Sequence, residues 1–214
     1  MSPSNEFSKG AEWRKWDLHI HTPETKLNDQ YKTGGKDIWK EFCKRIENSD
    51  VQAFGITDYF SADGYLAFIK NFQKEYPDSK KVFFPNIEIR TSDVVNAAQE
   101  EVNLHILFNS FQPKIENQIK TFLQNLKTNK TDSRGRNIKT SELSNKDDFE
   151  SATTIRKFIE EAFTDTFGDK TDLTDFLLVF TAANNDGIRS ERGKKRKAAI
   201  TDEIDKFSHG FFVS

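Results

Sequence analysis

Cysteine is almost absent from this sequence, because Cys43 is the single one among 214 residues. One thiol excludes an internal disulfide and a zinc site built from cysteine thiolates, and it fits a reducing compartment. Long apolar runs are also missing, since no stretch approaches the roughly 18 residues of a membrane span. Residues 1–10 are polar and lack the apolar region of a signal peptide. We therefore expect a soluble cytoplasmic protein with no membrane partner.

An excess of charge of one sign is lacking as well. The 32 lysines and arginines nearly balance the 34 aspartates and glutamates, which leaves a formal net charge of −2. This balance excludes a globally basic nucleic-acid binder but not a local basic patch. What the chain does contain is 20 phenylalanines, although hydrophobic residues make up only 35% of it. We expect one domain, residues 1–214, with a core rich in aromatic rings.

Strand-like and helix-like stretches alternate along the chain. Short apolar or alternating stretches predict strands at Trp16–His21, Val51–Thr57, Lys81–Phe84, Ile87–Arg90, Val102–Phe108, Phe176–Thr181 and Gly210–Val213. Apolar residues at helical spacing predict helices at Lys36–Asn48, Ala62–Tyr76, Ile155–Phe167 and Ile200–Phe207, and after Pro113 as first helical residue. Such alternation is typical of an α/β protein with mostly parallel strands, which binds ligands at the carboxyl ends of its strands.

Two stretches interrupt this alternation. Residues 129–150 are polar and rich in lysine, and we interpret them as a surface insertion. Residues 184–187 are a turn pattern, and a basic run follows them. That run either binds the phosphates of a substrate or is a solvated loop; its cationic members are Arg189, Arg192, Lys194, Lys195, Arg196 and Lys197.

The first predicted strand carries two histidines, His19 and His21. Because alternate residues of a strand point to the same side, both rings are expected on one face. The same rule divides the strand into two sets: Asp17, His19 and His21 on one face, and Trp16, Leu18 and Ile20 on the other. Imidazole is the commonest metal ligand in proteins, and a carboxylate behind it fixes its tautomer. The alternative is a half-buried strand with one polar face.

Three more ligand-type residues lie in or directly after predicted strands. Asp58 follows the second strand, while Glu88 and His105 each stand between two apolar residues. A carboxylate or an imidazole in an apolar strand is costly unless it is paired or binds metal. A Glu88–Arg90 pair and a core hydrogen bond of His105 are the alternatives. We favour a metal site, and its mixed ligands suit zinc, manganese or iron.

These residues, in this order, resemble the PHP (polymerase and histidinol phosphatase) superfamily. Its motifs match Asp17–Thr22, Ile56–Tyr59, Asn86–Ile89 and Asn103–Leu107. The longer sequence segments Glu12–Pro23 and Gly55–Phe60 look like the amino-terminal PHP domain of large SMC-like ATPases, which are linked to DNA repair or phage defence. The resemblance is most specific between residues 12 and 108.

The resemblance implies a distorted (β/α)7 barrel that binds two or three divalent metal ions and hydrolyses phosphoesters. His19, His21, Glu88 and His105 would be ligands, with Glu88 bridging two ions. Asp58 would be a ligand or would support one, and catalysis would depend on Asp58 and Glu88. The implied partners are a nucleic acid or another phosphoester substrate and an SMC-like ATPase region.

The chain departs from the family pattern at several points. Tyr59 stands where the second motif normally has a histidine. The late Asp-x-His motif is missing, and His209 does not fit it because its neighbours are Ser208 and Gly210. We expect the chain to end before the last barrel elements, either as a piece of a longer protein or as a shortened domain.

Two functions follow from this pattern. The first is a metal-dependent phosphoesterase, specifically a nuclease, and the second is a non-catalytic scaffold that binds nucleic acid or a partner domain. The ordered histidines and Glu88 favour the first; Tyr59 and the missing motif favour the second. Stacking of Trp13, Trp16 or Trp39 on bases is a further possibility, but we expect Trp16 and Trp39 to pack in the core, as we do Cys43.

Overall fold

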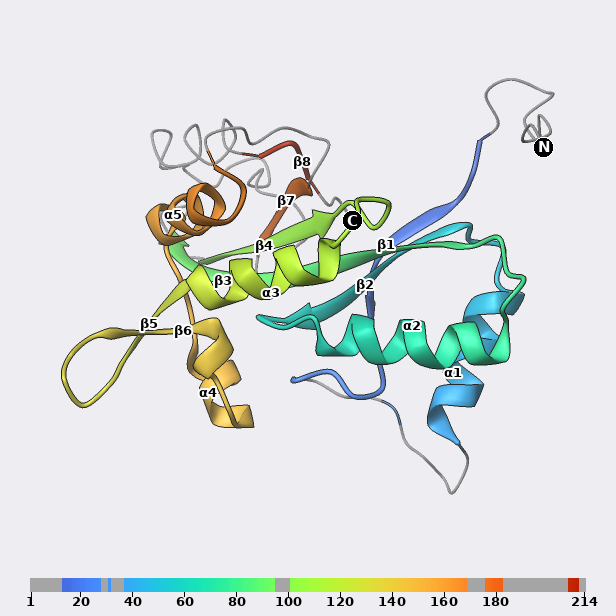
Figure 1. Cartoon of the computed structure of the whole chain (residues 1–214), viewed down its shortest axis with the longest axis horizontal. Helices are drawn as coiled ribbons and strands as arrows, with labels where there is room; N and C mark the ends of the chain where they lie inside the picture. The colour runs from blue at the N-terminus through green and yellow to red at the C-terminus, as the bar shows by residue number, and fades with distance from the viewer. Residues whose placement is uncertain are drawn as a thin grey trace, which may run out of the picture.

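The computed structural model describes residues 13–27, 31, 37–94, 101–168, 176–182 and 208–211. Its main sheet has the order β1-β2-β3-β4-β7-β8, with β1 at Trp16–His21, β2 at Ala53–Tyr59, β3 at Val82–Val94, β4 at Glu101–Phe108, β7 at Phe176–Ala182 and β8 at Gly210–Phe211. The helices are α1 (Ile38–Asn48), α2 (Asp63–Glu75), α3 (Ile115–Asn125), α4 (Lys146–Ser151) and α5 (Arg156–Phe167). The predicted α/β class is confirmed (Figure 1).

Most neighbouring strands of this sheet are parallel, but β4 runs against both of its neighbours. The pairs β1–β2, β2–β3 and β7–β8 are parallel, whereas β3–β4 and β4–β7 are antiparallel. The expected distorted (β/α)7 barrel is not observed in the described part of the chain. There, β1 and β8 are the two edges of an open sheet of six strands.

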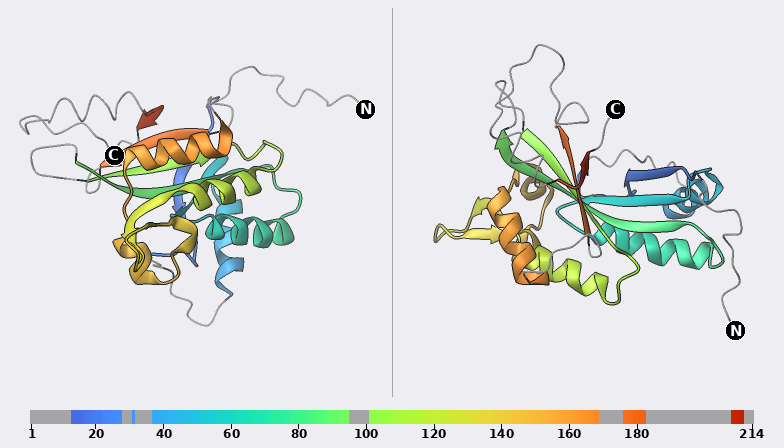
Figure 2. Two further views of the ribbon diagram at one scale, coloured as in Figure 1. Left: turned by 60° about the vertical axis from the view of Figure 1, so that its left-hand side comes forward. Right: turned by 90° about the horizontal axis from the view of Figure 1, so that it is seen from above.

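Helices cover one face of this sheet, which we call the helix face (Figure 2). On it, α1 and α2 pack against Phe54 and Ile56 of β2. Next to them, α3 and α5 pack against Ile87 of β3 and Leu104 of β4. The core is rich in aromatic rings, as expected. Among the residues whose burial the structure describes, the fully buried rings are Phe54, Phe60, Phe68, Phe108 and Phe122.

A bulge in β1 decides which side chains reach the opposite face. Asp17 pairs with Phe54, but Ile20 pairs with Ile56, so two residues of β1 lie against Gly55. An extra residue in one strand exchanges the faces of all residues beyond it. A regular strand would align His19 with Ile56 on the helix face. The bulge instead brings both histidines to the other side.

We call that other side the site face; its side chains include Trp16, His19, His21, Tyr59, Phe84, Asn86, Glu88 and His105. The predicted division of β1 was therefore wrong, because Trp16 lies on the same face as the two histidines. The expectation that Trp16 packs in the core was also wrong, since it is 59% exposed. Trp39 of α1 is partly buried and packs against the core, and Cys43 is fully buried, as predicted.

The structure differs from the prediction around two prolines, Pro85 and Pro113. The segments expected at Lys81–Phe84 and Ile87–Arg90 form one strand, β3, which passes through Pro85. Pairing with β4 begins only at Asn86, so the missing N–H of Pro85 costs no bond on that side. Pro113 is not the first residue of α3. The helix begins at Ile115, after Lys114 in a left-handed conformation with φ of 66°.

The segment interpreted as a surface insertion is ordered and contributes to the core. It forms a hairpin of β5 (Lys127–Thr131) and β6 (Asn137–Lys139), a 3-10 turn at Thr140–Glu142, and α4. Leu143 and Phe149 from this segment are buried in the same cluster as α3 and α5. Its polar residues are mostly exposed, which accounts for its composition.

Several predicted features lie outside the described residues. These are the turn at 184–187, the basic run at 189–197 and the helix at 200–207. None of the helices that the structure describes has the length and apolar character needed to cross a membrane.

Candidate metal centre

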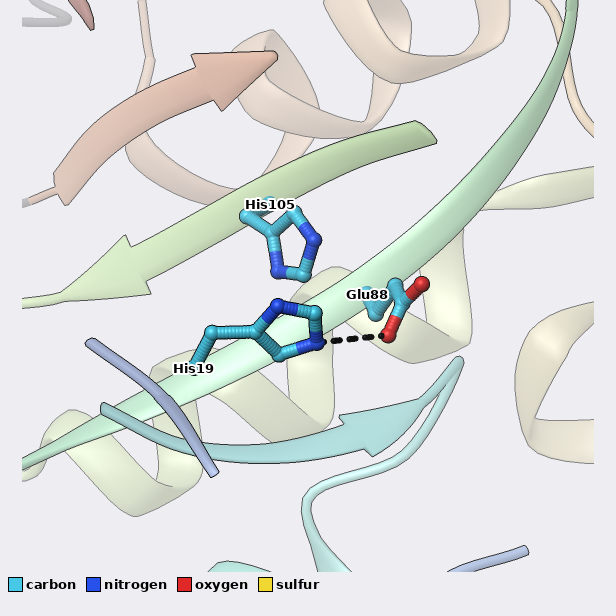
Figure 3. A group of neighbouring side chains, drawn as sticks. All are labelled: His19, Glu88 and His105. Atoms are coloured by element: carbon cyan, nitrogen blue, oxygen red, sulfur yellow. Dashed lines mark ion pairs between the residues drawn. The ribbon is translucent and has the colours of Figure 1, made fainter. Parts of the chain in front are cut away.

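Four predicted ligands, carried by three strands, meet on the site face. Glu88 of β3 lies directly opposite His105 of β4 in the antiparallel register, and the bulge in β1 adds His19 and His21. Ligand atoms of His19, Glu88 and His105 all lie within 4.8 Å of one another (Figure 3). The Nε2 atom of His21 lies 3.2 Å from Nε2 of His19 and 3.2 Å from Oε2 of Glu88.

Glu88 provides a buried negative charge at the centre of this group. Its Oε2 atom lies 3.4 Å from Nε2 of His19. Its other oxygen, Oε1, accepts a hydrogen bond of 3.1 Å from Nδ2 of Asn103. Burial opposes ionisation of Glu88, but contacts with His19 and His21 outweigh it and hold the pKa of the carboxyl well below its usual range. Glu88 is therefore a carboxylate, the form that binds a cation.

His105 is neutral and presents a lone pair. Burial lowers the pKa of His105 to about 3, although the charge of Glu88 favours the protonated ring. Its Nδ1 atom lies 3.2 Å from Oδ1 of Asn86. A carbonyl oxygen can only accept, so Nδ1 carries the proton and Nε2 has the lone pair.

His21 is oriented by a second hydrogen-bonded chain. The hydroxyl of Thr25 donates to Oδ1 of Asp58 at 3.0 Å, so it must accept from Nδ1 of His21, 3.3 Å away. This leaves Nε2 of His21 directed at Glu88. The ring of His21 also stacks on Tyr59 with centroids 4.8 Å apart.

Asp58 lies outside the cluster of ligand atoms. Besides Thr25, its Oδ1 atom accepts hydrogen bonds from the backbone N–H groups of Lys26 and Tyr59, at 2.8 and 2.9 Å. Its Oδ2 atom accepts from the N–H of Gly64 at 3.3 Å. Burial raises the pKa of Asp58 although these hydrogen bonds favour the carboxylate. Of the two roles considered for Asp58, the structure favours support of His21 over direct ligation.

The donor set fits one divalent ion. His19, Glu88 and His105 offer two imidazole nitrogens and one carboxylate oxygen within 4.8 Å of one another, and these are ligands that zinc accepts in tetrahedral sites and that iron and manganese also bind. The Nε2 atom of His21 lies beside this group, 3.2 Å from Oε2 of Glu88. His19 is partly exposed, with 38% of its side chain accessible, whereas Glu88 and His105 are buried. A ligand or substrate would therefore reach the site from the side of His19. The described residues bring together donors for one ion, not for the two or three that the family resemblance implies.

Sequence reasoning missed the residues that orient these ligands, namely Thr25, Asn86 and Asn103. A pattern that indicates two of them is present. Asn86 stands two residues before Glu88, and Asn103 stands two residues before His105. Each asparagine therefore lies on the same face of its strand as the metal ligand that follows it. The alternative pairing of Glu88 with Arg90 is not what the structure describes. Arg90 donates to the carbonyl of Glu150 and lies over the ring of Tyr59.

The basic run from Arg189 to Lys197 lies outside the described residues, so its role stays a prediction.

No protein-family model matches the sequence, and no curated protein matches it. Among solved structures, the chain is similar to a Bifidobacterium adolescentis protein described as a candidate metal-dependent phosphoesterase. The match is 14% identical, covers 92% of this chain and 76% of the other, and has a TM-score of 0.40. A TM-score this low does not establish a shared fold.

Proposed function

We propose that this chain is a metal-dependent phosphoesterase. The observation that carries the proposal is the convergence of His19, His21 and His105 on the buried carboxylate of Glu88, with His19 open to solvent. A zinc, manganese or iron ion bound there would lower the pKa of a bound water and polarise a phosphoester oxygen. The residues of the chain hold the ion, keep His105 neutral and keep Glu88 ionised.

The experiment is a comparison of matched variants. Purified protein is assayed with added manganese or zinc against bis(p-nitrophenyl) phosphate, and bound metal is counted by elemental analysis. We expect His19→Ala to reduce hydrolysis to the level of the chelator-treated protein. Lys70→Ala, which changes an exposed residue of α2 on the helix face, serves as the control and should leave hydrolysis unchanged. Equal activity in His19→Ala would refute the proposal.

We further propose a nucleic acid as the substrate. A row of aromatic rings that begins on the site face supports this choice, because bases stack on such rings. Trp16 lies 6.3 Å from Phe84, and Phe84 lies 6.2 Å from Phe111, between ring centroids. Phe111 is 73% exposed, and Phe84 stands on the same strand and face as Glu88. The rings would hold bases while the metal site acts on a phosphate.

Binding of a short single-stranded oligonucleotide in chelator tests this choice separately from hydrolysis. We expect Trp16→Ala to weaken binding by about tenfold, in line with the loss of one stacked base. Hydrolysis of bis(p-nitrophenyl) phosphate, which needs no base contact, should be unchanged. Tight oligonucleotide binding together with less than one metal ion per chain would favour the non-catalytic scaffold instead.

We also propose an SMC-like ATPase region as a partner, in DNA repair or phage defence. The sequence of Glu12–Pro23 supports this proposal, and copurification of the two tests it.

A further inference from the structure

One buried side chain, that of Asn86, contacts both β1, which carries His19 and His21, and His105 of β4. The bulge in β1 turns the carbonyl of Leu18 out of the strand pairing, and Nδ2 of Asn86 donates to this oxygen at 2.8 Å. An unsatisfied buried carbonyl would be costly, so this bond stabilises the bulge. The bulge, in turn, is what brings His19 and His21 to the site face.

The other end of the same amide acts on His105. The carbonyl of Leu18 can only accept a hydrogen bond, so the NH2 group of Asn86 must face it. The amide orientation is thereby fixed, and Oδ1 faces Nδ1 of His105 at 3.2 Å. Thr57 supports this orientation, because its Oγ1 atom accepts a second hydrogen bond from Nδ2 at 3.0 Å. Asn86 itself is 1% exposed, so water does not compete for these bonds.

We propose that Asn86 is the positioning residue of this centre. It holds the bulge that places His19 and His21, and it fixes the proton of His105 on Nδ1, so that Nε2 is available to a metal. Outer residues that fix the tautomer and the orientation of ligands typically change metal affinity by about 10–100-fold. The part of the inference that concerns metal affinity rests on the proposed function. The bulge and the tautomer of His105 do not, because they are properties of the metal-free chain.

The test uses two variants to separate the bond to Leu18 from the bond to His105. In Asn86→Leu, both of these bonds and the bond to Thr57 are lost. We expect nuclear magnetic resonance of the ring nitrogens to show that His105 no longer has its proton mainly on Nδ1, and zinc affinity to fall by about 10–100-fold. Asn86→Asp keeps an acceptor for His105 but has no donor for Leu18. We expect that variant to keep the tautomer and to lose the close contact between the rings of His19 and His105, whose centroids are 4.4 Å apart.

Asn103→Leu is the matched control. Asn103 donates to Glu88, so its loss should weaken zinc binding without moving the proton of His105. Two results would overturn the inference: a wild-type His105 protonated on Nε2, or an Asn86→Leu protein with unchanged tautomer and zinc affinity within twofold of wild type. The first is measured on the wild-type protein and holds even if a variant does not fold. Wild-type protein that shows the expected tautomer but hydrolyses nothing would refute the phosphoesterase and leave the role of Asn86 standing.

Discussion

Gly55 shows how a missing side chain makes room for the site. A Cβ atom added at Gly55 would lie 2.0 Å from the carbonyl oxygen of Leu18 and 2.8 Å from its Cα. The neighbour is backbone and cannot turn away as a side chain would. The extra residue of β1 thus occupies the space that any other residue at position 55 would fill.

We expect Gly55→Ala to destabilise the protein and to disturb the metal site. Overpacking of this kind costs about 1–3 kcal/mol, and relief of the clash would displace the bulge that places His19. Chemical denaturation measures the first effect, and zinc titration measures the second. Gly210→Ala is the control, since a Cβ there would meet none of the described residues within 4 Å; the stability of this variant should change by less than about 0.5 kcal/mol. A Gly55→Ala protein as stable as that control would contradict the close approach.

Cys43 gives a second prediction at the scale of a residue. Burial raises the pKa of the Cys43 thiol to about 11, so both low thiolate content and lack of access should protect it. We expect no reaction with Ellman's reagent at pH 8 in the folded protein and one thiol per chain in guanidinium chloride. Fast labelling of the native protein would show that α1 opens readily.

At the scale of elements, apolar spacing predicts the helices well, because helical periodicity extends over several turns. The predicted Lys36–Asn48 and Ile155–Phe167 differ from α1 and α5 by one or two residues at one end. Proline and lysine content predicted less. Pro85 did not end β3. The lysine-rich segment at 129–150 contains two side chains that are buried in the core, Leu143 and Phe149. A local pattern does not reveal which few residues of a polar segment the rest of the fold will cover.

That segment is expected to matter for stability. Phe149 of α4 is 5% exposed and packs in the cluster of α3 and α5. Phe149→Ala should cost about 3–5 kcal/mol, the usual effect of removing a buried phenyl group. Lys146→Ala, in the same helix but exposed, should cost less than about 0.5 kcal/mol. Equal denaturation midpoints for the two variants would show that the segment is peripheral.

At the scale of the whole molecule, the site joins β1 to β3 and β4, which lie far from β1 in the sequence. A ligand that binds only the folded chain stabilises it, by about 2.7 kcal/mol at a free concentration 100 times its Kd. We expect zinc to raise the melting temperature of the wild-type protein and EDTA to reverse the rise. His105→Ala should show little or no rise. A similar rise in both proteins would place the metal at some other site.

The types and order of the candidate ligands can be read from the sequence alone: three histidines and a glutamate lie in strand segments, in an order that resembles one family. Residue types and strand periodicity are local properties, so they can be read without a fold. Which face of the sheet these ligands share depends on the fold. The bulge of β1 exchanges the faces of its last residues, and it exists because Gly55 leaves space and Asn86 accommodates the released carbonyl of Leu18. Those contacts join residues 37 and 68 positions apart, a distance over which no local pattern extends.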